Sequence, residues 1–300
     1  MAGINTQGSK ARLLQLGVNA VATASFKDLA MEYDKIFTTY GSEKAYELDV
    51  AVSNGGLASL KPEGGDISYD DSKQDFTKNY THSVYALGGM LTMEAQMNNK
   101  YEDLAATTGK WLKRSLMHTD EQLAADVINV GYTNNDSMDG VPLFSTAHLL
   151  GKGGTFANRF TVFTALSQAA LEDANIALED FRDGANLLID AKGVSLHIPR
   201  QLKYIAKRIN GSTLEPDSAN NAINTMAGEF SNSTHVNHRF TSTTDWFIKT
   251  DVENGFKIFN RMGYTFSQDN DFGTENFRTK GMFYKSYGFT DPRCAYGSGT

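Results

Sequence analysis

Residues 46–90 (YELDVAVSNGGLASLKPEGGDISYDDSKQDFTKNYTHSVYALGGM) form a long stretch with strand-forming residues at both ends and a middle too polar to be buried. Val50 and Val52 alternate in the manner of a strand. A return strand is indicated by a second group of large residues: Phe76, Tyr80, Val84 and Tyr85. Between the two groups lie glycines, small residues and charges. A two-stranded arm of this kind is marginal by itself in water, so it must lie on another surface.

A helical pattern follows this arm over residues 92–132. Thr92 can cap the helix, and an apolar stripe runs along it through Leu104, Trp111, Leu112, Leu116, Leu123, Val127 and Ile128. Gly109 weakens the middle, and we expect residues 118–120 (His-Thr-Asp) to break the helix into two pieces. Since a helix rises about 1.5 Å per residue, even the first piece is a long rod.

Shorter elements flank this rod. The spacing of apolar residues predicts a helix over 25–37 and a second over 164–181. Residues 194–199 read as a buried strand with a helix over 201–209 directly after it, and strands dominate from 245 onward. The chain is therefore expected to be α+β, with a projecting hairpin and a flexible N-terminal arm.

The length, net charge and cysteine content of the chain exclude several classes of protein. With 300 residues, the chain can form one large domain or two modest ones. Its formal charge of −7 does not indicate nucleic-acid affinity, although a local basic patch can exist within an acidic total. The one cysteine, Cys294, cannot form an intramolecular disulfide. Neither a signal peptide nor a membrane-spanning apolar stretch is visible, so we expect no membrane partner and no export.

Ser145 and His148, in DGVPLFSTAH (139–148), form the first candidate catalytic pair. A serine nucleophile needs a base within hydrogen-bond reach, a group that orients the base, and oxyanion donors. Hydrolases of the α/β type place that serine in G-x-S-x-G, and here it lies in LFSTA without flanking glycines. We therefore interpret both residues as polar members of a connecting loop.

Three further motifs resemble ligand sites without completing one. GKGGT (151–155) has its lysine ahead of the last two glycines, the wrong order for a phosphate loop. DNDFGTE places Asp269, Asp271 and Glu275 around a glycine but lacks the regular ligand positions of a calcium loop. HVNH (235–238) has zinc-like spacing without a third ligand. We expect no catalytic, cofactor-binding or metal-binding residues, no cofactor, and no enzyme activity.

The order of the larger segments resembles tailed-phage major capsid proteins, especially the Mu-like major head subunit family. In that family a D-G-x-x-L-F-x-x-x-H segment follows a long helix, as residues 139–148 do here. Similar features continue in ALSQAALEDA, in VSLHIPRQLKYIAKRI, and in the closing strands from DWFIKT to the end. The resemblance covers roughly residues 90–300 and depends on order as much as on identity.

The resemblance implies the Hong Kong 97 phage capsid fold. It places an N-terminal arm and first helix at 1–48, an extended loop at 49–91, and a peripheral domain with its spine helix at 92–185. An axial domain at 186–260 would follow, and residues 261–300 would return to the peripheral domain. The arm and the hairpin would become ordered on neighbouring subunits.

The same resemblance implies a major capsid protein that assembles as hexamers and pentamers into an icosahedral shell. The shell would enclose double-stranded DNA without sequence-specific binding, in a virion assembled in the host cytoplasm. Its partners would be itself, a portal protein, and a scaffold or decoration protein. Two structural alternatives stay open: an encapsulin-type nanocompartment shell, and a phage tail or baseplate subunit. The short N-terminal region leads us to expect no fused, cleaved scaffold segment.

Some proteins of this fold join subunits by a bond between a lysine of the extended loop and an asparagine of a neighbour. Lys61, Lys73 and Lys78 lie in the hairpin, and Asn270 or Asn276 are conceivable partners. This chemistry also needs a buried carboxylate, which the sequence does not identify. We expect solvated lysines and no covalent cross-link.

Overall fold

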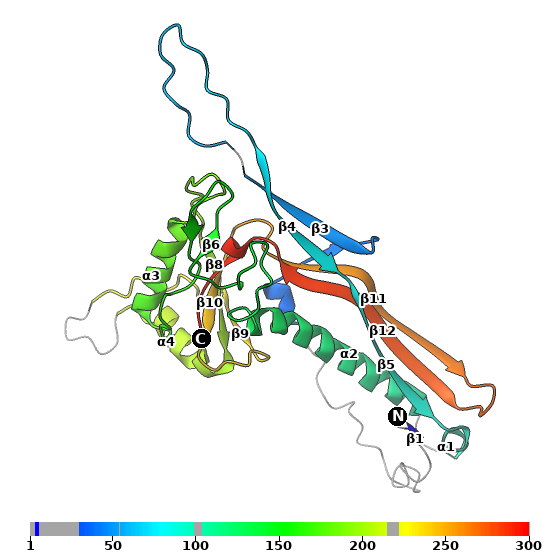
Figure 1. Cartoon of the computed structure of the whole chain (residues 1–300). Helices are drawn as coiled ribbons and strands as arrows, with labels where there is room; N and C mark the ends of the chain where they lie inside the picture. The colour runs from blue at the N-terminus through cyan, green and yellow to red at the C-terminus, as the bar shows by residue number, and fades with distance from the viewer. Residues whose placement is uncertain (1–3, 6–29, 54, 99–103, 215–221, 300) are drawn as a thin grey trace.

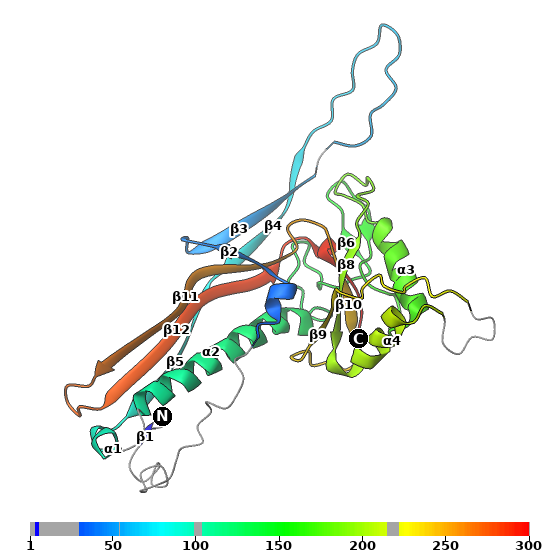
Figure 2. The same cartoon turned by 180° about the vertical axis from the view of Figure 1, so that it is seen from behind.

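The computed structural model describes residues 4–5, 30–53, 55–98, 104–214 and 222–299. The molecule is elongated: a compact end of mixed sheet and helix adjoins a long sheet with a helix along it, and a loop projects away from both (Figures 1 and 2). The chain combines helices with sheets whose strands are mainly antiparallel. The expected α+β class is confirmed.

The long sheet has the strand order β1-β5-β12-β11-β2. Its centre is the antiparallel hairpin of β11 (Phe256–Asn270) and β12 (Phe277–Phe289), with β5 (Ser83–Leu91) antiparallel to β12. The edges are two short parallel strands: β2 (Thr38–Gly41) beside β11, and β1 (Ile4–Asn5) beside β5.

Helix α2 (Leu104–Asn129) lies along one face of this sheet and contacts β5 and β12 (Figure 1). The helix and sheet approach closely at Gly281, where an added Cβ would lie 2.7 Å from Leu116 Cδ1. A short helix, α1 (Met93–Met97), precedes it, and the Thr92 hydroxyl accepts the Ala95 N–H at 3.3 Å as the predicted cap.

The expected break at residues 118–120 is wrong, because α2 runs through them. Thr119 satisfies its hydroxyl within the helix by donating to the Ser115 carbonyl at 3.0 Å. Asp120 is fully buried and accepts the Lys285 ammonium at 2.5 Å. One bond within the helix and one ion pair to β12 thus stabilise residues whose intrinsic helix propensity is low.

The projecting arm begins as an antiparallel pair, β3 (Tyr46–Ser53) and β4 (Lys73–Thr81), and continues as a loop over residues 55–72. The predicted return strand is divided at His82 into β4 and β5, so that one half pairs with β3 and the other joins the long sheet. The buried His82 ring contacts the hydroxyls of Ser42 and Ser286 at this division.

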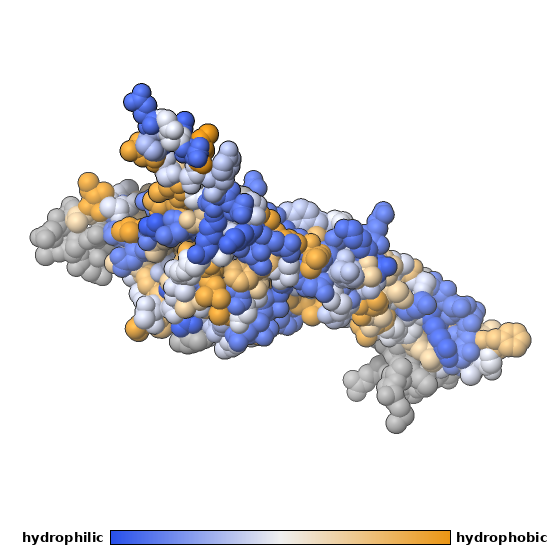
Figure 3. All heavy atoms as spheres, turned by 45° about the horizontal axis from the view of Figure 1, so that its top comes forward, coloured by the Kyte–Doolittle hydropathy of each residue, from blue (hydrophilic) through white to orange (hydrophobic). Residues whose placement is uncertain are grey.

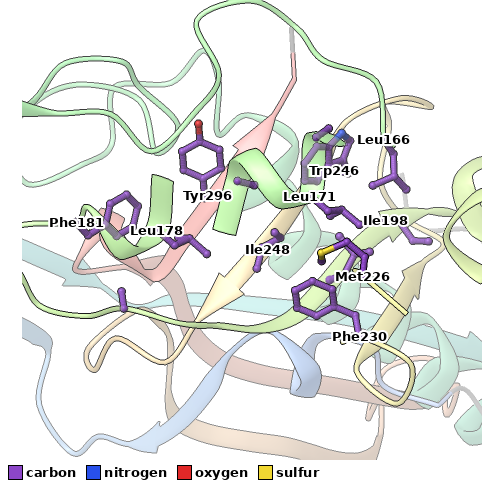
Figure 4. Close-up of a cluster of buried hydrophobic side chains, with 14 of the residues drawn as sticks. Leu166, Leu171, Leu178, Phe181, Ile198, Met226, Phe230, Trp246, Ile248 and Tyr296 are labelled. Carbon is purple, nitrogen blue, oxygen red and sulfur yellow. The ribbon is translucent and has the colours of Figure 1, made fainter. Parts of the chain in front are cut away.

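The compact end is built on a four-stranded sheet of order β13-β10-β8-β9. The strands are β8 (Gly193–Pro199), β9 (Thr234–Asn237), β10 (Trp246–Thr250) and β13 (Ala295–Ser298). Beside them lie α3 (Gln168–Glu179), the 3-10 turn η3 (Arg200–Leu202) and α4 (Lys203–Gly211). Their shared core is a cluster of buried aromatic and aliphatic side chains that includes Trp246, Leu171, Ile248 and Phe230 (Figure 4).

The helix expected over 25–37 is wrong in its described part. Residues 30–37 contain only the 3-10 turn η2 (Tyr33–Lys35), and β2 starts at Thr38. The Tyr33 N–H donates to the Glu121 carboxylate of α2 at 3.3 Å instead of to a helical carbonyl, and Ile36 and Phe37 are buried in the core beside α2. The rest of this prediction, and the N-terminal arm apart from β1, lie outside the described residues.

Candidate functional site

The first candidate pair, Ser145 and His148, does not form a nucleophile and base. His148 is fully buried, with Nδ1 2.9 Å from the Asp139 carboxylate and Nε2 3.1 Å from the Leu143 carbonyl. The Ser145 hydroxyl instead accepts the Ala147 N–H at 3.2 Å, and its own N–H donates to Asn158. Both ring nitrogens of His148 face structural acceptors, so the ring fixes a connector and has no free nitrogen for proton transfer.

Asp139 and Asn158 explain why this connector holds its shape. Burial by itself would raise the pKa of the Asp139 carboxyl, but the hydrogen bond and charge of His148, together with the bonds from Ser137 and the Leu149 N–H, lower it overall. The fully buried Asn158 amide donates to the Leu143 and Pro292 carbonyls at 2.7 and 2.8 Å. Asn158 therefore links the segment from Asp139 to His148 to the turn at Pro292 that precedes β13.

The GKGGT motif forms the turn of a small hairpin between β6 (His148–Leu149) and β7 (Thr155–Phe156). The Lys152 ammonium reaches outward to the Asp70 carboxylate of the projecting loop at 2.7 Å. This bond, together with the Gly56 N–H, lowers the pKa of Asp70 to about 2. The lysine thus tethers the loop.

The DNDFGTE segment is the turn that joins β11 to β12. Asp271 accepts the Thr274 hydroxyl at 3.0 Å and forms an ion pair with Arg278, and the Glu275 N–H donates to the Asp271 carbonyl at 2.7 Å. Asp269 accepts the N–H of Asn270. The carboxylates of Asp269 and Asp271 therefore serve the turn.

The two histidines of HVNH have different surroundings. The His238 ring is exposed and lies 2.5 Å from the Glu32 carboxylate, whereas His235 lies beside the buried His197 with ring centroids 5.2 Å apart. Burial lowers the pKa of His197 well below its usual range, with further lowering from His235 and Lys249. Within the described ranges, no group of three or more histidine, cysteine or acidic residues is arranged to hold a metal.

The lysines and asparagines considered for cross-linking lie in distant parts of one chain. Lys78 is nearly buried and pairs with Asp136 at 2.6 Å, so it is not a free nucleophile in this subunit. Lys61 and Lys73 lie in the projecting arm, whereas Asn270 and Asn276 flank the turn at the far end of the long sheet (Figures 1 and 2). Any contact between the two sets would require a second subunit.

A cavity of about 570 Å³ lies between the base of the arm and the compact end. Acidic side chains outnumber basic ones along its wall. At one side Lys257 pairs with Asp49 of β3 at 2.6 Å, and the Thr290 hydroxyl donates to the same carboxylate. Gly151 allows the approach of the arm, because an added Cβ would overlap the Asp75 carboxylate.

These contacts fix the base of the arm, and sequence reasoning missed them. Asp49 and Lys257 are 208 residues apart, so no local spacing relates them. The sequence did carry one signal: in β3 the polar residues Glu47, Asp49 and Ser53, with Ala51 among them, lie on the face opposite the large apolar residues.

The outer side of the arm exposes large apolar side chains. In β3, Tyr46, Leu48, Val50 and Val52 share the exposed face. In the loop, Leu57, Leu60 and Tyr69 are 87%, 95% and 90% exposed. Figure 3 shows the projecting loop with hydrophobic patches among hydrophilic ones. Exposed apolar surface of this extent is typical of a protein interaction site.

Two further findings concern the cysteine and the helices. Cys294 is buried and free, and burial raises the pKa of its thiol well above the usual range, so the thiol is unreactive. Among the helices that the structure describes, none is long and apolar enough to cross a membrane.

Comparison with known proteins links this architecture to phage capsids. No protein-family model and no curated protein sequence matches the chain. The capsid structure of the cyanophage P-SCSP1u matches with a TM-score of 0.57 at 14% identity, covering 98% of this chain and 94% of that chain. A structure of Microbacterium phage Oxtober96 matches at 0.60 and 9% identity, covering 98% and 97%.

A third structure, the capsid of bacteriophage JBD30 decorated with minor capsid protein trimers, matches at 0.60 and 11% identity, covering 80% of this chain and 100% of that chain. The predicted Hong Kong 97 capsid fold is confirmed by these likenesses. At such low identities the likeness establishes the fold, and the function has to be argued from the surfaces.

Proposed function

We propose that this chain is the major capsid protein of a tailed bacteriophage. The observation that carries the proposal is the combination of the capsid fold over nearly the full chain with an arm whose large apolar side chains face solvent. A subunit that worked alone would gain nothing from such an arm, since exposed apolar surface favours association. The role is structural and non-enzymatic.

The assembly would consist of hexamers and pentamers of this chain arranged in an icosahedral shell. We assign residues 1–48 to the N-terminal arm, 49–91 to the extended loop, 92–185 to the peripheral domain with α2 as spine helix, and 186–260 to the axial domain. Residues 261–300 return to the peripheral domain except for β13, which pairs with β10. Many modest contacts, repeated over all copies, would hold the shell together.

The shell would enclose double-stranded DNA without sequence-specific binding, in a virion assembled in the host cytoplasm. A portal protein, and a scaffold or decoration protein, would be further partners. The net charge of −7 supports loose contact with the packaged DNA, because binding by counterion release requires basic surface. Tight binding would oppose packaging and ejection.

Sedimentation velocity of the purified wild-type protein tests the proposal. We expect particles of shell size in exchange with free subunits, and a solution of monomers or dimers at every concentration would contradict it. The contents of isolated particles distinguish the phage from the nanocompartment: nuclease-protected DNA supports a virion shell, whereas a co-purified enzyme indicates an encapsulin-type compartment. Stacked rings or tubes would indicate a tail or baseplate subunit.

A further inference from the structure

The outer face of α4 and the preceding turn carries a cluster of positive charge on an acidic chain. Its members are exposed: Arg200, Lys203, Lys207 and Arg208. In the part of the chain that the structure describes, none of the four has a carboxylate partner. The opposite face of the helix holds the buried Ala206 and Asn210, so the orientation of the cations toward solvent is fixed by packing.

An aromatic residue and a hollow lie within this basic face. Tyr204 is 71% exposed, and the Lys203 ammonium lies 5.9 Å from its ring centroid. A shallow hollow of about 570 Å³ is lined by Tyr204, Lys207, Arg208, Gly211 and Ser212. Tyrosine and arginine are both enriched in protein interfaces, and a lysine is compatible with the polar rim of such a contact.

The outer face of α3 has the opposite charge around an exposed apolar residue. Ile176 is 68% exposed, and Asp173, Glu179 and Asp180 lie three or four residues away on the same side of the helix. The inner face is held in the core by buried residues: Ala170, Leu171, Ala174 and Leu178. Ile176 is therefore an exposed apolar residue among acidic side chains, of which Asp180 pairs with Arg182 of its own chain at 3.1 Å.

We propose that the basic face of α4 in one subunit docks on the acidic face of α3 in the next subunit of the same ring, with Ile176 seated in the hollow beside Tyr204. This inference rests on the proposed function, because it names the contact between neighbours in a capsomer. Both helices lie at the compact end, on the side away from the long sheet (Figures 1 and 2). A contact between two different faces of identical subunits repeats head to tail and closes into a ring when the rotation allows.

Charge and hydropathy together favour a second copy over nucleic acid. A phosphate backbone would use the four cations but would offer no apolar group for the hollow. The α3 face supplies carboxylates and an apolar side chain in one patch, and every subunit carries one such patch for each basic face. Opposite charges across the contact set the register and exclude pairing of like faces.

Charge reversal tests the contact. We expect K203E/K207E and D173K/E179K each to lower the yield of assembled particles at least tenfold, measured by sedimentation velocity. The quadruple variant, in which both faces are reversed, should recover particles. Mixing the two double variants should also give mixed oligomers, since each reversed face then meets a complementary one. K192E, at an exposed lysine of the same end, is the matched control and should assemble like the wild type.

The outcomes separate this inference from the proposed function. If the wild type and K203E/K207E both form particles in equal yield, the contact is overturned while the shell assignment stands. Failure of recovery in the quadruple variant, with thermal unfolding unchanged, also overturns it. A loss of DNA retention in K203E/K207E with an unchanged particle yield would assign the basic face to nucleic acid instead. Mixed oligomers of the two double variants support the contact even if closed shells never form.

Discussion

At the scale of single residues, the molecule depends on a few buried polar groups that join distant segments. The clearest is Asp120, which lies in the middle of α2 and binds Lys285 of β12. The hydroxyls of Tyr264 and Tyr287 donate to the same carboxylate. Burial, followed by the hydrogen bond to Asp120 and the charge of its carboxylate, raises the pKa of both tyrosines far above the usual range, so they stay neutral donors.

We expect Asp120→Asn to lower the free energy of unfolding of the subunit by roughly 3–5 kcal/mol, because the Lys285 ammonium would remain buried without its counter-charge. Urea denaturation of isolated subunits measures this change. Asp173→Asn, an exposed acid-to-amide change on α3, is the control and should change the free energy by less than about 0.5 kcal/mol. Equal stability of Asp120→Asn and wild type would contradict the role given to this carboxylate.

The buried His197 makes stability depend on pH. Its ring is stacked on Phe247 and close to His235 and Lys249, and its pKa lies below the ordinary value of 6.5. Below that pH the unfolded chain takes up a proton that the folded chain does not, so stability is full above about 6.5 and falls as the pH decreases.

Replacing the His197 ring should weaken the dependence of the free energy of unfolding on pH. We expect the free energy of unfolding of His197→Gln to depend less on pH between 7 and 5 than that of the wild type, whatever its absolute value. An unchanged slope in His197→Gln would show that the acid sensitivity originates elsewhere.

At the scale of elements, hydrophobic spacing predicted correctly those helices and strands that pack one apolar face against the core. The helix over 164–181 and the strand over 194–199 follow from hydrophobic spacing, and α3 and β8 are found there. The predicted break in α2 was wrong, and so was the predicted helix over its described residues 30–37, because contacts between distant segments override propensity.

The candidate motifs also show that local sequence patterns do not reveal contacts between distant segments. The sequence led us to interpret Ser145 and His148 as members of a connector, because the motif around Ser145 lacks the glycines of a nucleophile turn. It could not reveal that Lys152 tethers the loop through Asp70, or that Lys257 holds Asp49. Those pairs form only when the arm lies against the β6–β7 turn and the start of β11, and no spacing along the chain encodes that approach.

The projecting loop can be tested as a separate element. We expect L57S/L60S/Y69S to fold with the thermal midpoint of the wild type, because these side chains contact solvent in the subunit. Assembly should fall at least tenfold, since the apolar surface of the loop is then lost. K61S/E63S changes polar residues of the same loop and should assemble normally. Loss of folding in the triple variant, or full assembly, would contradict this view of the loop.

At the scale of the whole molecule, different parts of the fold serve the stability of the subunit and its assembly with neighbours. Two core clusters, one under α3 and one beside α2, stabilise the body, while the arm and the outer faces of α3 and α4 remain exposed for neighbours. Assembly strength would then come from repetition and not from any one strong contact.

This view predicts a shell without covalent links. Lys61 and Lys73 of the hairpin are exposed to solvent, and Lys78 is paired with Asp136. Boiling assembled particles in detergent should therefore return a single monomer band on a denaturing gel. A ladder of multimers that survives boiling would show that a lysine and an asparagine of neighbouring subunits are joined.

The most direct test of the central claim is negative-stain electron microscopy of the wild-type protein after size exclusion. A capsid subunit should give closed icosahedral shells, with capsomers visible at their surface. A uniform population of monomers or dimers over a wide range of protein and salt concentrations would contradict the assignment as a shell protein.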